Sequence, residues 1–295
     1  MANIIPDTID FSAYMASAEG QHRVISAAAY VDEVIEYFHG ESRNAGVVLP
    51  WAKTHHNIRF RPAEVTLWAG LNGHGKSLVI GQFCISMIET QGQPVCIASM
   101  EMKPMVTLAR MCRQFCKDTK PDVEMIRMFH EVTGSHLWLY DQQGTVNAEK
   151  MLAVMRYCAQ EKGIKHFVLD SLMKCGIAED DYTGQKLFVD AICTISRDTG
   201  MHIHLVAHSK KQRDEMSPPG KMDVKGSGAI TDQVDNVLTV WRNKPKEVSL
   251  QEGSHDRMNE PDAMLICDKQ RNGEWEGKVA LWFDRQAMRF TEGKW

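Results

Sequence analysis

The sequence lacks the features that mark membrane proteins, secreted proteins and zinc modules. No run of about 18 apolar residues occurs in the chain, so no membrane-spanning helix is expected. The N-terminus has no basic stretch leading into an apolar one, which argues against a signal peptide. The eight cysteines form no C-x-x-C pair, which argues against a zinc module and for free thiols in a reducing compartment. We therefore expect a cytoplasmic protein with no membrane partner.

The sequence also lacks an excess of basic residues. Lysine and arginine number 34 against 38 aspartates and glutamates, which gives a formal net charge of −4. A protein of this charge has no overall attraction for nucleic acid, so any polyanion contact must come from a local basic patch. The 295 residues, of which 43% are hydrophobic and 24% charged, suit one large or two ordinary globular domains.

One segment carries a motif with specific chemistry. Residues 70–77 read GLNGHGKS and fit G-x-x-x-x-G-K-[ST], the phosphate-binding P-loop, between a strand-like and a helix-like segment. Such a loop directs backbone N–H groups and the positive end of a helix dipole at a polyphosphate. Lys76 is expected to reach the β and γ phosphates and Ser77 to ligate Mg²⁺. The residues predicted to bind nucleotide here are Gly70, Asn72, Gly73, His74, Gly75, Lys76, Ser77 and Leu78.

The first 60 residues differ from the rest of the chain. Residues 25–38 are predicted to form an amphipathic helix that ends before Gly40, whereas residues 42–61 have no clear periodicity. A segment of this size with one helix could hardly bury a core of its own. We therefore interpret residues 1–60 as a short helical N-terminal arm and residues 61–295 as the folded domain.

From about residue 62 onward, strand-like and helix-like segments alternate. This alternation predicts an α/β fold with a mainly parallel central sheet, helices on both faces and a C-terminal β section. Ligands of such sheets lie beyond the carboxyl ends of the strands. The predicted strands are residues 64–68, 94–98, 137–140, 164–169, 202–207, 236–241, 264–267 and 279–283, and the predicted helices are residues 77–88, 103–117, 147–162 and 187–199.

Three polar residues stand just after predicted strands. Asp170 is suited to hold Mg²⁺, the alternative being a helix cap or a surface carboxylate. Glu101 is suited to polarise an attacking water, the alternative being an exposed residue before a helix. His208 is placed to touch a γ-phosphate. We interpret His202 and His204 as structural, because no carboxylate stands beside them in the sequence.

Basic residues gather in two later segments. In residues 209–225, five basic residues outnumber three acidic ones, a net charge of +2, which suits either a polyphosphate-backbone contact or a solvated loop. Arg271 and Lys269 follow the strand 264–267, in a turn that suits a hairpin or a cation reaching a neighbour's nucleotide site. The candidate DNA-binding residues are Lys210, Lys211, Arg213, Lys221 and Lys225.

The order of these motifs resembles that of the ring-forming replicative helicases of the DnaB-like family, including the helicase half of phage primase–helicases and Twinkle. His208 is typical of the phage type, since many bacterial members have Gln there, so we expect a phage-like member. The expected location is the cytoplasm of a bacterial or phage-infected cell. The sequence has no primase or zinc module, so we expect no priming by this polypeptide. The matching segments are 70–77, 99–102, 168–172, 207–210, 225–230, 241–243 and 269–273, within about 63–290.

The resemblance implies a RecA-like P-loop NTPase core that assembles head to tail, as a hexamer, around single-stranded DNA. It implies ATP or another NTP with Mg²⁺ at subunit interfaces, and a primase or polymerase as further partners. Glu101 would activate water and His208 would sense the γ-phosphate. The helix at 25–38 would dock on an adjacent subunit. In the same way Arg271 would act in trans with Lys269 beside it, Arg242 and Phe283 would flank the base, and Lys210, Lys211 and Lys225 would bracket a channel loop.

The sequence therefore favours an ATP-dependent replicative DNA helicase. Two alternatives stay open at this point. One is a RecA/RadA- or KaiC-like ATPase, in which ATP controls assembly without unwinding. The other is an accessory ATPase that binds a true helicase.

Overall fold

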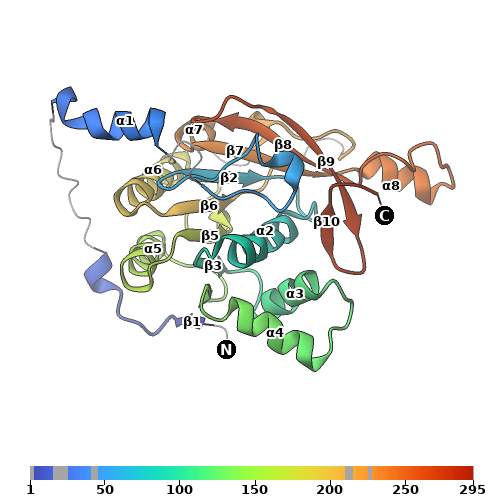
Figure 1. The fold of residues 1–295 in the computed structure, drawn as a ribbon, viewed down its shortest axis with the longest axis horizontal. Coiled ribbons are helices and arrows are strands. Elements are labelled where there is room, and N and C mark those ends of the chain that lie inside the picture. The colour runs from blue at the N-terminus through green and yellow to red at the C-terminus, as the bar shows by residue number, and fades with distance from the viewer. Residues whose placement is uncertain (1–2, 16–25, 41–45, 210–214, 225–227, 295) are drawn as a thin grey trace.

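A ten-stranded sheet runs through the molecule (Figure 1). A computed structural model describes residues 3–15, 26–40, 46–209, 215–224 and 228–294. The strand order is β1-β4-β3-β5-β6-β2-β7-β8-β9-β10, in which β1 to β7 are all parallel and β8, β9 and β10 are antiparallel to their neighbours. The strands are β1 (Asn3–Pro6), β2 (Val65–Ala69), β3 (Val95–Ser99), β4 (Leu137–Asp141), β5 (His166–Asp170), β6 (His202–Val206), β7 (Asn236–Arg242), β8 (Ala263–Gln270), β9 (Gly277–Asp284) and β10 (Arg289–Thr291).

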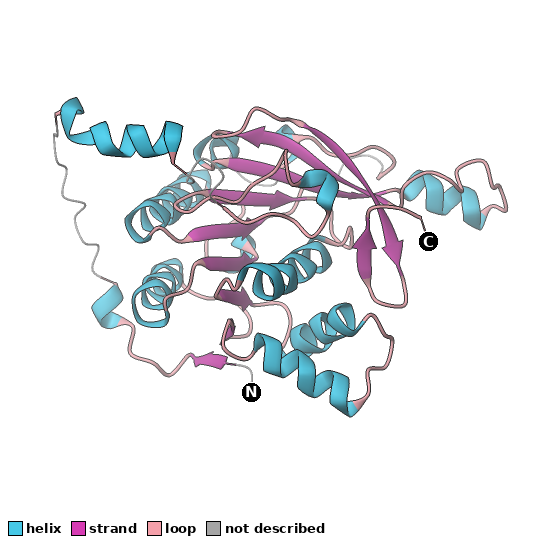
Figure 2. Ribbon diagram, viewed as in Figure 1, coloured by secondary structure: helices cyan, strands magenta, loops and turns pink. Residues whose placement is uncertain are grey.

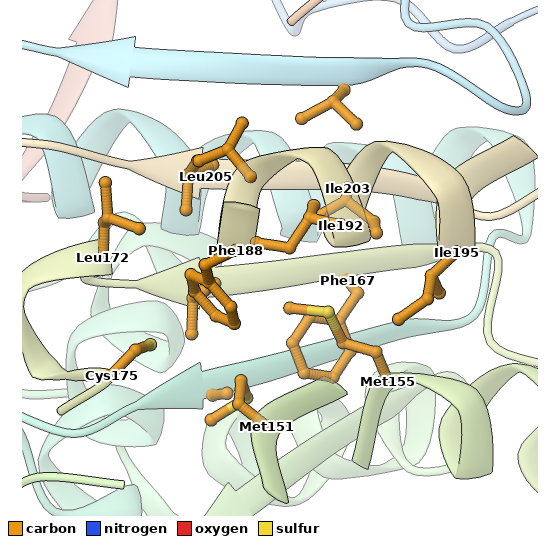
Figure 3. Packing of buried hydrophobic residues seen from close by; sticks show 14 of the residues in the cluster. Met151, Met155, Phe167, Leu172, Cys175, Phe188, Ile192, Ile195, Ile203 and Leu205 are labelled. Carbon is orange, nitrogen blue, oxygen red and sulfur yellow. The ribbon is translucent and has the colours of Figure 1, made fainter. Parts of the chain in front are cut away.

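Helices cover both faces of the sheet (Figure 2). Strand side chains alternate between the faces, so that Leu67 packs in one core cluster while Trp68 packs in the other. The first cluster joins the sheet to α5, α6 and α7, and Figure 3 shows Phe167 there between helical side chains such as Met155 and Ile192. The second joins it to α2, α3 and α4. The α-helices are α1 (Val31–His39), α2 (Lys76–Gln91), α3 (Pro104–Cys116), α4 (Val123–Thr133), α5 (Ala148–Lys162), α6 (Tyr182–Thr199), α7 (Gly228–Gln233) and α8 (Lys244–Gln251).

The predicted α/β fold is confirmed, and each predicted strand and helix of the domain is present within a few residues of its expected bounds. The sequence reading missed β1, α4, α7, α8 and β10. Two of these are strands of only four and three residues, too short to show a period. Among the helices that the structure describes, none combines the length and apolarity needed to cross a membrane.

The first 60 residues contain the predicted helix and also parts of the core. The helix forms as η2 (Ala27–Tyr30) followed by α1, and α1 ends at Gly40. Residues 3–6 add a parallel strand to the edge of the sheet. In residues 46–60 the predicted irregular chain buries Val47, Leu49, Trp51, Ile58 and Phe60 in the second core cluster. The division at residue 60 stays a prediction, but this arm supplies part of the domain's packing.

Three histidines are stacked inside the sheet. His166 of β5 and His202 and His204 of β6 are fully or almost fully buried, with ring centroids 4.5–5.6 Å apart. The indole N–H of Trp68 donates to Nδ1 of His204 (3.3 Å), so the other nitrogen of that ring, Nε2, donates to Nδ1 of His166 (3.1 Å). Nδ1 of His202 donates to the carbonyl of Arg61. The side chains are thus satisfied as neutral imidazoles, as the structural interpretation of His202 and His204 expected.

This cluster makes the stability of the fold sensitive to acid. Burial lowers the pKa of His202 to about 4, and burial also lowers the pKa of His166 and of His204 well below the ordinary value. The unfolded chain binds these protons near pH 6.5, so stability is fully present above that pH and is lost as the pH falls toward 4. We expect the free energy of unfolding, measured with urea, to drop by about 1.4 kcal/mol per pH unit for each imidazole.

The variant His166→Asn is the matched control, because its amide oxygen can still accept from His204 while the titrating ring is gone. Its unfolding free energy should fall less steeply over the same pH range, because unfolding takes up about one proton fewer. This corresponds to a slope smaller by about 1.4 kcal/mol per pH unit. An unchanged slope would show that this cluster does not cause the acid sensitivity.

Candidate functional site

The P-loop connects β2, in the middle of the sheet, to the start of α2. Gly75 is the residue before α2 and has φ +92°, and Gly70, at the end of β2, has φ +145°. A Cβ on Gly70 would lie 2.4 Å from the carbonyl oxygen of Val240, so only glycine lets the backbone turn there. The loop therefore delivers the N-terminus of a 16-residue helix to the carboxyl edge of the parallel strands.

Lys76 is a buried cation held by the loop itself. Its Nζ donates to the carbonyl oxygens of Gly70 (2.8 Å) and Leu71 (3.0 Å) and lies 3.3 Å from Nδ1 of His208. Burial lowers the pKa of Lys76 to about 8, while the carboxylates of Asp170 and Glu101 counter that fall. An anionic ligand beside Nζ would stabilise the charged form, so the residues present fit a polyphosphate.

Ser77 and Asp170 form the other half of this fit. The Ser77 hydroxyl donates to Oδ2 of Asp170 at 2.7 Å, across the gap between α2 and β5. Burial raises the pKa of Asp170, and the Ser77 hydrogen bond and Lys76 oppose this effect. A hydroxyl and a carboxylate side by side are the oxygen ligands that Mg²⁺ prefers. The two residues predicted to hold the metal are thus brought together.

Glu101 and His208 also meet at this edge. Nε2 of His208 lies 3.9 Å from Oε1 of Glu101, and Glu101 is largely exposed. The backbone N–H of Ser209 donates to the carbonyl oxygen of Gly70 (3.1 Å), which ties the end of β6 to the P-loop. These side chains surround a cavity of about 340 Å³. It is lined by Asn72, Gly73, Gly75, Lys76, Ser77, Leu78, Glu101, Met102, Arg110, Asp170 and His208.

Arg110 is a cation of this cavity that the sequence reading missed. It lies on α3 and donates to Sδ of Met102. It shares one helix face with Thr107, Met111 and Gln114, which line the adjacent hollow under the P-loop. The helical spacing of these residues is visible in the sequence. That this face turns toward the phosphate site depends on how α3 packs against α2.

A larger cavity of about 590 Å³ lies on the other side of the P-loop. Gly73, His74 and Gly75 form its wall toward the P-loop, and Arg242 and Phe283, the two residues predicted to flank the base, both line it. The guanidinium of Arg242 contacts the carboxylate of Glu247 on α8. Because Gly73 and Gly75 line both cavities, a ligand with a phosphate end and an apolar ring end could extend across the loop.

The last strand, β10, contributes Phe290 to the lining of this larger cavity. A Cβ on Gly75 would lie 3.1 Å from Cζ of Phe290 in β10, so the ring of Phe290 packs on the P-loop. The side chain of Gln82 on α2 accepts from the backbone N–H of Phe290 and donates to its carbonyl, both at 2.8 Å. The indole N–H of Trp51 donates to the same carbonyl at 3.0 Å. β10 is thereby fixed to the P-loop helix.

Arg271 and Lys269 lie at the opposite edge of the sheet. β8 runs against β7, so its last residue, Gln270, pairs with Asn236 at the start of β7, whereas Ala69 before the P-loop pairs with Thr239. Nη1 of Arg271 lies 3.0 Å from Oδ1 of Asp235. Nζ of Lys269 donates to three backbone carbonyls at 2.7–2.9 Å. The structure does not bring either cation to the P-loop of its own chain.

Only one of the five predicted DNA-binding residues lies within the described part of the chain. Lys221 is exposed in the short 3-10 helix η6 (Lys221–Asp223). Lys210, Lys211, Arg213 and Lys225 lie outside the described residues. The DNA-binding role of these five residues therefore stays a prediction.

Comparison with known proteins matches the chain to one family model and to solved structures of similar fold. The family model described as the DnaB-like helicase C-terminal domain matches residues 57–292. The fold is similar to that of the ATPase domain of G40P, with a TM-score of 0.73 and 16% identity over 90% of this chain and 98% of that one. It is also similar to a DnaB-like replicative helicase described with its interactions with primase, with a TM-score of 0.71 and 15% identity over 91% and 67% of the two chains. The predicted RecA-like fold is confirmed.

The close contact at Gly70 gives a test of the P-loop geometry. Gly70→Ala should lower the free energy of unfolding by at least about 3 kcal/mol, because the new Cβ meets the Val240 carbonyl in a backbone conformation that already disfavours a side chain. Gly92→Ala is the control: Gly92 has φ +59° with nothing within 4 Å of the new Cβ, and should cost only about 1–2 kcal/mol. Urea unfolding measures both, and equal losses would contradict the steric argument.

Proposed function

Because the chain belongs to the DnaB-like helicase C-terminal domain family, we propose that it is the motor of an ATP-dependent replicative DNA helicase that moves along single-stranded DNA. The observation that carries the proposal is the convergence of Lys76, the Ser77–Asp170 pair, Glu101 and His208 on one cavity at the carboxyl edge of the sheet. This arrangement supports hydrolysis of a nucleoside triphosphate.

The P-loop, Ser77, Asp170, Glu101 and His208 each have a chemical task in hydrolysis. The P-loop amides and Lys76 bind the β and γ phosphates and stabilise the charge that develops on them. Ser77 and Asp170 hold Mg²⁺, which neutralises phosphate charge when bound. Glu101, exposed toward the cavity, orients the attacking water and takes its proton. His208, between Lys76 and Glu101, responds to the γ-phosphate.

The nucleoside would occupy the larger cavity. Arg242 and Phe283 are placed to contact the base, and Gly73 and Gly75 let the phosphates pass to the other side of the loop. The cavity joins apolar and charged side chains, which suits a ring system with polar edges.

The site is completed by a second copy of the chain. Arg271 and Lys269 stand at the amino edge of the parallel strands, opposite the P-loop. In a head-to-tail assembly that edge faces the P-loop edge of the next copy, so that Arg271 would act in trans on its neighbour's ATP, with Lys269 beside it. We propose a hexameric ring on this basis.

The helix of the N-terminal arm would dock on the adjacent copy. All described side chains of α1 are exposed, and among them Val31, Val34, Ile35 and Phe38 leave 51–58% of their surface in solvent. In Figure 1 this helix lies at the margin of the molecule. An apolar face of this size on a water-soluble helix is typical of a protein contact.

The basic loop would face the channel of the ring. We propose that Lys210, Lys211, Arg213, Lys221 and Lys225 contact the phosphates of single-stranded DNA, because six copies together would present many cations to one strand. Primase is a candidate partner, since one similar helicase was described with its interactions with primase. We place this activity in the cytoplasm of a bacterium or a phage-infected cell.

Mixing two inactive variants tests the shared site. Arg271→Ala should lower the rate of ATP hydrolysis by about 10³-fold or more, and Lys76→Ala should abolish it, because each removes cationic charge from the same transition state. In a mixture, an interface formed by the P-loop of the first variant and Arg271 of the second is intact. ATP hydrolysis and strand displacement should therefore both recover to a measurable fraction of wild type.

Full activity of Arg271→Ala alone would remove the trans assignment. Hydrolysis by the wild-type protein without any strand displacement would instead favour a RecA- or KaiC-like ATPase.

The arm helix gives a separate test of assembly. Ile35→Asp with Phe38→Asp should shift the protein from the hexamer to smaller species, because two charges would enter the apolar contact. Light scattering coupled to size exclusion measures the mass, and circular dichroism checks that the domain stays folded. Met258→Asp, at another apolar side chain that is 44% exposed, is the control and should leave the mass unchanged. A hexamer that survives the double change would show that α1 does not hold the ring.

A further inference from the structure

The side chain of Glu64 is a buried carboxylate at the amino edge of the sheet. Glu64 directly precedes β2, and only 3% of its side chain is exposed. Nη1 of Arg61 lies 3.7 Å from Oε1 of Glu64, which is beyond hydrogen-bond distance. A buried carboxylate costs stability unless hydrogen bonds compensate for the loss of water. The donors around Glu64 therefore show which parts of the chain depend on it.

The two oxygens of Glu64 accept from two different segments of the chain. Oε1 accepts from Nδ2 of Asn272 at 2.8 Å, and Oε2 accepts from Nδ2 of Asn236 at 3.0 Å. Asn236 begins β7, and Asn272 lies in the turn between β8 and β9, next to β2 in the sheet (Figure 1). A glutamine side chain has one acceptor oxygen, so among side chains of this length only a carboxylate accepts both bonds. Glu64 thus joins the start of β2 to the turn after β8.

The turn that Glu64 holds is the one that carries Arg271. The backbone N–H of Arg271 donates to the carbonyl of Asp235 at 2.8 Å, and Nη1 lies 3.0 Å from Oδ1 of the same residue. Oδ2 of Asp235 accepts from the backbone N–H of Val65, the first residue of β2, at 2.9 Å. Two carboxylates therefore fix the turn to the start of β2, one bound to Arg271 and the other to the residue after it.

These two carboxylates hold the turn in different ways. Asp235 contacts the guanidinium of Arg271 itself, whereas Glu64 holds the turn through Asn272. The side chain of Arg271 is 43% exposed, so its guanidinium reaches the surface of the chain. A group that acts on a second molecule needs a fixed base, because a displacement of about 1 Å can cost about 10²-fold in rate. Glu64 supplies part of that base.

We infer that Glu64 is a positioning residue for Arg271 and thereby serves the nucleotide site of the adjacent copy. The inference rests on the proposed function, in which Arg271 acts in trans. The hydrogen bond from Asn272 to Glu64 keeps the turn in the orientation that presents Arg271 at the amino edge. The P-loop of the same chain begins at the opposite end of β2, so Glu64 acts on the neighbour's ATP and leaves its own P-loop unaffected.

The variant Asn272→Asp tests this hydrogen bond, because it places a second carboxylate against Oε1 of Glu64 and repels the turn. With saturating ATP, Mg²⁺ and oligothymidylate, the full-length variant should hydrolyse ATP about tenfold or more slowly than the wild type. Its binding of a fluorescent ADP analogue should stay within about twofold of wild type, since the P-loop is intact. Asn272 is exposed, and circular dichroism checks that the variant is folded.

The reciprocal double change restores the hydrogen bond with its direction reversed. In Glu64→Gln with Asn272→Asp, the new amide donates to the new carboxylate, and the amide oxygen still accepts from Asn236. Hydrolysis should return to within about threefold of wild type. Asp268→Asn is the matched control, because it removes a carboxylate of β8 that accepts from Oγ1 of Thr239 at 2.8 Å and does not contact the turn through that bond. This control should hydrolyse ATP as the wild type does.

Mixed assemblies show which nucleotide site the change affects. Asn272→Asp subunits mixed with Lys76→Ala subunits form interfaces that have an intact P-loop and an intact Arg271, so part of the hydrolysis should recover. Mixed with Arg271→Ala subunits they form no such interface, and hydrolysis should stay slow. A change that weakened only the chain's own P-loop would give the opposite pattern. Adding Asn272→Asp to Arg271→Ala should cause no further loss, because both changes remove the same interaction.

The outcomes separate this role from the proposed function. Full activity of Arg271→Ala would remove the trans assignment and the role of Glu64 with it. Three results would instead show that Glu64 does not position Arg271 while leaving the proposed function in place, provided that Arg271→Ala is slow. They are wild-type hydrolysis by Asn272→Asp, its rescue by Arg271→Ala subunits, and failure of the double change to restore hydrolysis.

Discussion

The buried ammonium of Lys76 is the interaction on which the site depends. A cation out of contact with water needs compensation, and here two P-loop carbonyls and the nearby carboxylates of Asp170 and Glu101 supply it in part. The positive φ of Gly70, which leaves no space for a side chain, is part of the loop conformation that places those carbonyls beside the ammonium group. A polyphosphate would supply the negative charge that is missing here, so the arrangement of the loop around Lys76 also favours binding of an anionic ligand.

Strand direction places the two groups of candidate site residues at opposite edges of the sheet. Seven parallel strands bring their carboxyl ends, and with them Ser77, Asp170 and His208, to one edge. The antiparallel turn into β8 carries Arg271 to the other edge. No rearrangement within one chain short of unfolding the sheet would join the two edges. The head-to-tail assembly that we propose would instead bring the two edges of neighbouring copies together.

Local patterns in the sequence were sufficient to predict much of the fold and many of the candidate site residues. The P-loop, the alternation of elements and the residues that follow strands depend on short-range chemistry. Glu101, Asp170 and His208 could therefore be predicted as site candidates, and all three line the same cavity. Arg110 was missed because its place depends on how two helices pack. The hydrogen bond of Asn272 to Glu64 joins residues 208 positions apart, and no period or spacing in the sequence signals such a pairing.

The position of Phe290 has a consequence for biosynthesis. Its ring packs on Gly75, and its backbone bonds to Gln82 and Trp51, so the P-loop is braced by a strand made more than 200 residues later. A ribosome that has translated this sequence as far as residue 280 has produced every candidate phosphate-binding group but not this brace. The nascent chain therefore acquires a finished nucleotide pocket only after Phe290 has been made and has packed on the P-loop, which delays ATP turnover until that point.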